Sequence, residues 1–177
     1  MTTEELYDKL KLIQKMKCET QNLELKSAEQ GYPKRVYDSL SSFSNQDDGG
    51  IIVFGIDEKQ DYKEVGVYDA QDIQKKINEQ CLQMNPVVRP LITVVEKENK
   101  KFVSAEIPGI DLADRPCYYQ GRGRLKGSYT RIGDSDEPMT EYEIYSYEAY
   151  RRKYQDDIRE VPRVTLMSLD QEELNRY

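Results

Sequence analysis

The sequence predicts one domain that combines helices with a sheet. A continuous apolar run, 51–56, is rich in β-branched residues and bounded by glycines, which favours a strand buried on both faces. Apolar side chains at helical spacing indicate helices on both sides of this run in the chain. Two further apolar stretches, 91–96 and 101–107, flank a polar turn and predict a hairpin. These patterns predict a mixed helix-and-strand fold built around one central strand.

The first two elements are expected before residue 30. A first helix is expected near the N-terminus, where Thr3 can cap it. Its apolar stripe consists of Leu6, Leu10, Ile13 and Met16. Residues 23–26 alternate between leucines and charged residues, which predicts a strand that carries Glu24 and Lys26 on one polar face.

A second helix should lead into the central strand. It is expected to start with Pro33 in its first turn and to end at Asn45. Gly49 and Gly50 then let the chain turn sharply, and we expect a positive φ at Gly50. A third helix is expected over 70–84, with an apolar face made of Ile73, Ile77, Cys81 and Met84.

The C-terminal third is predicted to hold a short strand, 129–133, and a last helix. Thr140 and Glu143 form a capping box that opens this helix, which should reach about residue 154. Its tyrosines are expected to pack against the sheet or a partner subunit rather than stack on bases. We expect a domain over 1–155 and a tail, or the start of a following region, over 156–177.

Composition excludes several classes of function. The net charge is −7 and the pI is about 4.9, so any contact with nucleic acid must come from a local basic patch. The chain has no histidine, which excludes Ser-His and Cys-His catalysis. Three widely spaced cysteines show neither zinc nor disulfide spacing and suit a cytoplasmic protein with reduced thiols. No apolar run is long enough to span a membrane, so no membrane partner is expected.

Three carboxylates, Glu19, Glu24 and Asp57, are candidate catalytic and metal-binding residues. If the strand at 23–26 pairs beside the central strand, Glu24 and Asp57 meet at one edge of the sheet. Oxygen ligands of this kind suit Mg²⁺ or Mn²⁺, which could activate water for hydrolysis. The simpler alternative is that these groups are solvated carboxylates, because the chain has 33 acidic residues.

A basic, tyrosine-containing segment is the second candidate site. Its cations stand out in an acidic chain and are Arg115, Arg122, Arg124, Lys126 and Arg131. Arginine forks match phosphate oxygens, and tyrosine rings can stack on bases. The alternative is a solvated, flexible loop. The order Lys126-Gly127-Ser128 inverts the one that a Walker-type nucleotide site requires, so that site is rejected.

The ordered motifs resemble the Schlafen Alba-like domain family, historically also labelled a divergent AAA or ATP-binding region. The matching stretches cover roughly 16–140 and are 19–26, 41–45 with 49–57, 65–67, 115–118 and 129–133. The resemblance implies an α+β fold: a mixed sheet of Alba-like units with helices packed on it. Within the motifs, Lys26 matches a family lysine, and we add it to the expected nucleic-acid-binding residues.

The resemblance also implies a nucleic-acid role, for DNA or RNA. Bacterial members look like transcriptional regulators, so a nucleic-acid-binding domain of such a regulator is the favoured function. Some animal relatives are ribonucleases whose two glutamates and one aspartate map onto Glu19, Glu24 and Asp57. The alternative is therefore a metal-dependent endoribonuclease that uses Mg²⁺ or Mn²⁺. The older family label implies a third reading, an ATP-binding module. A homodimer is compatible with each of these functions.

Overall fold

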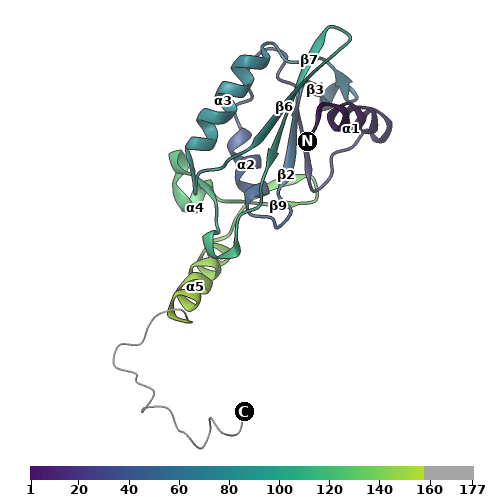
Figure 1. Ribbon diagram of the computed structural model, residues 1–177. Coiled ribbons are helices and arrows are strands. Elements are labelled where there is room, and N and C mark those ends of the chain that lie inside the picture. The colour runs from purple at the N-terminus through teal and green to yellow at the C-terminus, as the bar shows by residue number, and fades with distance from the viewer. Residues whose placement is uncertain (158–177) are drawn as a thin grey trace, which may run out of the picture.

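A mixed four-stranded sheet forms the centre of the computed structural model, which describes residues 1–157 (Figure 1). The strands lie in the order β1-β2-β7-β6, with bounds Leu23–Lys26, Gly50–Phe54, Lys100–Ile107 and Leu91–Lys97. β1 pairs with β2 in parallel, and the other two pairings are antiparallel. The predicted α+β class and the interior place of the central strand are confirmed. The expected tail, 156–177, lies almost entirely outside the described residues.

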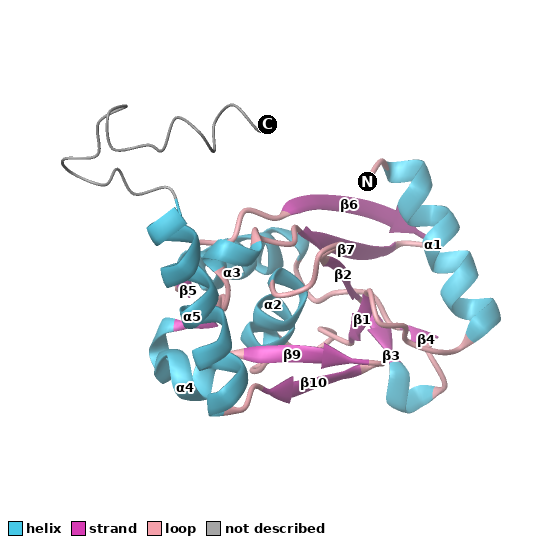
Figure 2. Ribbon diagram, turned by 90° about the horizontal axis from the view of Figure 1, so that it is seen from below, coloured by secondary structure: helices cyan, strands magenta, loops and turns pink. Residues whose placement is uncertain are grey.

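Helices and small strand pairs complete the described part of the chain (Figures 1 and 2). The helices are α1 (Thr3–Met16), α2 (Val36–Ser44), α3 (Ala70–Leu82), α4 (Gly123–Gly127) and α5 (Glu141–Asp157). The strand pairs are β3 (Ile56–Asp57) with β4 (Lys63–Glu64), β5 (Met84–Asn85) with β8 (Tyr118–Tyr119), and β9 (Tyr129–Ile132) with β10 (Ser135–Pro138). Three short 3₁₀ segments are η1 (Glu58–Gln60), η2 (Leu112–Asp114) and η3 (Gln120–Arg122).

The central strand is apolar along its whole length because helices cover both faces of the sheet (Figure 1). Val53 packs in a cluster with the apolar stripe of α1. Ile52 and Phe54 point the other way and pack in a cluster with α2 and α3. Alternate side chains of a strand face opposite sides, so a strand between two helical layers has no position for a solvated residue.

Helix boundaries differ from the expected ones at several caps. The capping box of α1 is made by Thr2 and Glu5, so the cap is Thr2 and not Thr3. Met16 is 50% exposed and does not belong to the buried stripe. Pro33 precedes α2 instead of lying in its first turn, and α3 ends at Leu82. The capping box expected at the start of α5 is present.

The basic segment around residue 125 is folded and is not a flexible loop. It forms η3 and the one-turn helix α4 before the chain enters β9. Glycines at both ends of α4 conceal this helix in the sequence, because glycine is a poor helix former. A Cβ atom on Gly127 would lie 2.5 Å from the carbonyl oxygen of Tyr119, so this glycine permits a close approach of two backbones.

Candidate functional site

A buried arginine joins the acidic and basic candidate residues. The side chain of Arg131, on β9, is fully buried, and its Nη1 donates to Glu24 Oε2 (2.7 Å) and to Asp136 Oδ1 (2.9 Å). Its Nη2 donates to the carbonyl oxygen of Leu23 (3.1 Å), and the guanidinium lies 5.1 Å from the ring centroid of Phe43. Because the guanidinium is buried and already paired, we assign Arg131 a structural role instead of the expected phosphate contact.

Serine hydroxyls of α2 extend this ion network into the core. Ser39 donates to Asp136 Oδ2 (2.6 Å), and Ser42 donates to the other oxygen of the same carboxylate. All nine residues of α2 are buried, including four serines. Sequence reasoning missed Asp136 and β10. The signal that could have found them is the serine content of α2, because buried hydroxyls need polar partners.

A second set of polar bonds links α2 to the segments at 117 and 129. Asn45 accepts from the amide of Cys117 (2.7 Å) and donates to its carbonyl oxygen (3.0 Å). Ser41 donates to that same carbonyl (2.7 Å) and accepts from the amide of Tyr129 (2.8 Å). The motif at 41–45 therefore holds the two later motifs, 115–118 and 129–133, against the central helix.

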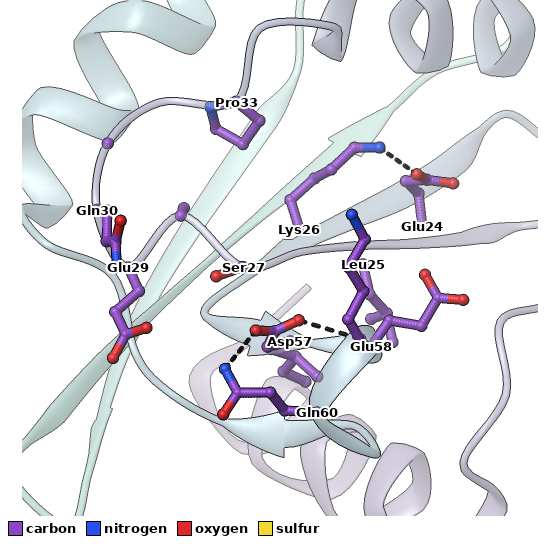
Figure 3. Close-up of a pocket in the computed structure, with 14 residues that line it drawn as sticks. Glu24, Leu25, Lys26, Ser27, Glu29, Gln30, Pro33, Asp57, Glu58 and Gln60 are labelled. Atoms are coloured by element: carbon purple, nitrogen blue, oxygen red, sulfur yellow. Dashed lines mark hydrogen bonds and ion pairs between the residues drawn. The ribbon is translucent and has the colours of Figure 1, made fainter.

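A polar cavity of about 570 Å³ opens at the carboxyl ends of β1 and β3 (Figure 3). Glu24, Lys26 and Asp57 are among its lining residues, together with the 27–33 loop and η1. β1 pairs in parallel with β2, but Glu24 lies opposite Ile52, five residues before Asp57, so the two carboxylates share the lining of the cavity and do not meet at one point. Lys26 Nζ forms an ion pair with Glu24 Oε1. Lys26 therefore lies in the cavity as a half-buried cation that is already partnered.

The three candidate carboxylates are bound to different protein donors. Glu19 Oε1 accepts from the amide of Leu25 (2.6 Å), whereas Glu24 pairs with Lys26 and Arg131. Asp57 caps η1: it accepts from the amide of Lys59 (3.0 Å) and from Gln60 Nε2 (2.6 Å). Within residues 1–157, no three or more acidic, histidine or cysteine side chains are grouped to hold a metal ion. These three residues thus do not fit a Mg²⁺ or Mn²⁺ centre, and we derive no hydrolytic step from them.

Glu19 is a half-buried acid with an unusual proton affinity. Its pKa is raised from 4.5 to about 7, chiefly by burial and next by the nearby carboxylate of Glu24. The hydrogen bond from the amide of Leu25 lowers the pKa of Glu19, since it stabilises the charged carboxylate. Because the chain has no histidine, this carboxyl group is a main candidate for titration near neutral pH.

We expect Glu19→Gln to flatten the dependence of stability on pH between about 4.5 and 7. The folded protein holds this proton more tightly than the unfolded chain, so wild-type stability should fall as pH rises through that range. The loss should amount to about 1–3 kcal/mol. Denaturant unfolding at several pH values measures it, and glutamine keeps an acceptor for the Leu25 amide.

Glu29→Gln provides the control for this prediction, since Glu29 is exposed and the substitution changes the net charge equally. Its pH profile should keep the wild-type slope. If Glu19→Gln keeps that slope as well, the proton affinity of Glu19 is ordinary.

Arg115, another expected phosphate ligand, is also engaged by the protein. Its Nε and Nη2 donate to the carbonyl oxygen of Ile110 (3.1 and 3.0 Å), and Nη2 donates to Asp47 Oδ1 (2.6 Å). The residue is 7% exposed, whereas the Asp47 side chain is 91% exposed. Arg115 therefore stabilises two loops, and its burial leaves little of it accessible to a phosphate.

The remaining three cations, Arg122, Arg124 and Lys126, lie together on η3 and α4 and are exposed. Arg122 stacks over the ring of Tyr37, with 5.3 Å from the guanidinium carbon to the ring centroid. Arg124 forms an ion pair with Glu148 of α5 and remains 42% exposed. We call these three residues the basic turn. It is separate from the cavity at Glu24, and Arg131 lies on the strand that follows it.

Comparison with known proteins gives a family match over most of this site. A family model described as Schlafen, AlbA_2 matches residues 19–140. The chain matches none of the curated proteins. Within residues 1–157, no helix combines the length and the hydropathy of a membrane span.

Two solved structures are similar to the chain. The first is the N-terminal domain of an ATP-dependent DNA helicase RecG-related protein from Nitrosomonas europaea, with 27% identity and a TM-score of 0.56. The match covers 79% of this chain and 94% of that one. The second is the DIP2311 protein from Corynebacterium diphtheriae, with 16% identity and a TM-score of 0.50. This match covers 74% of this chain and 24% of the Corynebacterium diphtheriae chain. At this level of identity it shows a shared fold only.

Proposed function

Because the chain belongs to the Schlafen AlbA_2 family, we propose that it is a nucleic-acid-binding domain that contacts phosphates through its basic turn. The observation that carries the proposal is the position of Arg122, Arg124 and Lys126, three exposed cations on one short segment. The similar domain from Nitrosomonas europaea, whose parent protein is described as related to a DNA helicase, adds support.

Because the chain is acidic overall, it can bind phosphates only where several exposed cations lie close together. The net charge is −7, so the protein as a whole repels a polyanion. Arg115 and Arg131 are withdrawn into the protein, and Lys26 is half-buried and paired with Glu24. The basic turn is therefore the exposed part of the expected phosphate-binding set. A local cluster of cations can bind phosphates when the protein as a whole is acidic.

Replacing Arg122, Arg124 and Lys126 together by alanine should weaken binding and reduce its dependence on salt. Each phosphate contact contributes about 0.7–0.9 to the slope of log affinity against log salt. Arg124 shares its charge with Glu148, so we expect the slope to flatten by about 2 units. Fluorescence anisotropy with single-stranded and duplex probes, repeated over a range of salt concentrations, measures the slope.

Three lysines of α1, Lys9, Lys11 and Lys15, provide a control with the same change in net charge. Their replacement by alanine should leave the salt slope within error of the wild type. The proposal is wrong if the basic-turn variant keeps the wild-type slope, or if the wild-type protein binds no probe at low salt.

A transcriptional regulator is the finer form of this proposal. It is supported by the resemblance to bacterial members of the family, and the three widely spaced cysteines suit a cytoplasmic location. Recovery of specific DNA fragments bound to the protein from its source cells would support a regulator, whereas recovery of RNA alone would oppose it.

A further inference from the structure

Helix α5 exposes aromatic side chains instead of packing them on the sheet. Three of its tyrosines are well exposed: Tyr142 (81%), Tyr145 (52%) and Tyr150 (43%). The helix is held to the domain by the fully buried Ile144 and by Arg151, which donates to the carbonyl oxygens of Ala113 (2.7 Å) and Arg115 (2.9 Å). These three rings therefore contribute little to holding α5 in place.

Two of these tyrosines share one open face of the helix. Tyr142 and Tyr145 are three residues apart, and side chains at this spacing are neighbours on a helix surface. The same face continues through Ala149 to Arg152, both of which are exposed. Tyr150 lies five residues after Tyr145, so it points to another side of the helix.

The basic turn lies beside this face. Arg124 of α4 forms an ion pair with Glu148, which follows Tyr145 by three residues on α5. The amide of Met139 donates to the carbonyl oxygen of Ser128 (3.0 Å), so α5 begins next to the end of α4. The basic turn and the exposed rings of Tyr142 and Tyr145 are thus carried by two neighbouring segments, which together present cations and aromatic rings on one surface region.

We propose that this surface binds single-stranded nucleic acid, with bases stacked on Tyr142 and Tyr145 and phosphates held by the basic turn. The inference rests on the proposed function and adds the class of ligand. Stacking on a tyrosine requires an exposed base face, which a single strand offers and a duplex keeps inside its own stack. Glu148 does not oppose this ligand strongly, because Arg124 compensates its charge.

The test compares Tyr142→Ala/Tyr145→Ala with the wild type on labelled oligo(dT), oligo(rU) and a DNA duplex. We expect the double variant to lose about 10- to 100-fold in affinity for the single strands, since each base stacked on an aromatic ring contributes substantially. Its salt slope should stay that of the wild type, because the phosphate contacts remain. The wild type should prefer the single strands to the duplex, and comparison of the two strands distinguishes DNA from RNA.

Two matched variants separate stacking from a general loss of structure. Tyr142→Phe/Tyr145→Phe keeps the rings and should keep the affinity, and Tyr150→Ala removes an exposed ring elsewhere and should also keep it. An abasic strand of the same length, which has phosphates but no bases, should bind wild type and double alanine variant equally.

Three outcomes would overturn the inference. In the first, the double alanine variant binds single strands as tightly as the wild type does. In the second, the wild type binds the abasic strand as tightly as oligo(dT). In the third, loss of the two tyrosines changes the oligomeric state of the protein. The last outcome would show that a second copy of the chain covers this face. None of these outcomes alters the salt-slope result for the basic turn, so the proposed function stands or fails separately.

Discussion

Arg131→Met should lower the free energy of unfolding by about 3–5 kcal/mol, the cost of breaking a buried ion pair by removing one partner. The substitution keeps much of the side-chain length but removes the charge and every donor. Glu24 and Asp136, whose side chains are each 9% exposed, would then keep their charges in a poorly hydrated place. The hairpin of β9 and β10 would also lose its link to β1.

A double-mutant cycle with Glu24→Gln attributes this loss to the ion pair. Neutralising Glu24 removes one of the two carboxylates that Arg131 compensates, so the double variant should be less destabilised than the sum of the single variants. Urea unfolding followed by circular dichroism measures all four proteins. Strict additivity would show that Arg131 and Glu24 are not coupled, and a loss below about 1 kcal/mol for Arg131→Met would show that the ion network contributes little to stability.

The sequence predicts the main elements of this fold because their patterns are local. The stripe of α1, the central strand and the hairpin of β6 and β7 each repeat an apolar pattern within one segment. The two-residue strands β3, β4, β5 and β8 are too short to show any period. Their pairing depends on distant partners, which the sequence of each segment alone does not reveal.

The candidate site was harder to predict because its key contact is distant in sequence. Glu24 and Arg131 are 107 residues apart, and each appeared in a different candidate set, one acidic and one basic. Charge alone could not show that these residues neutralise each other. Burial distinguishes the two kinds of arginine in the basic set: Arg131 and Arg115 are inside the protein, while the basic turn is on its surface.

The backbone at Gly50 differs from the expectation in an instructive way. The residue with positive φ is Gly49 (64°), whereas Gly50 opens β2 in an ordinary strand conformation. The reason for glycine at position 50 is the ring of Phe43. A Cβ atom on Gly50 would lie 2.3 Å from Phe43 Cδ1 and 2.4 Å from Cγ. Phe43 in turn supports the guanidinium of Arg131, so Gly50 makes room for the layer beneath the ion network.

Gly50→Val should therefore destabilise the domain by about 3 kcal/mol through overpacking, because Phe43 is fully buried and has little room to move. Thermal and urea unfolding measure the loss.

Gly133→Ala is the control for backbone strain. The φ of Gly133 is 62° and no atom lies within 4 Å of an added Cβ, so the substitution should cost about 1 kcal/mol. In a Phe43→Leu background, Gly50→Val should cost less than in the wild type, because the smaller side chain frees space. An undiminished cost in that background would place the clash elsewhere, and unchanged stability of Gly50→Val would mean that the Phe43 ring can move aside freely.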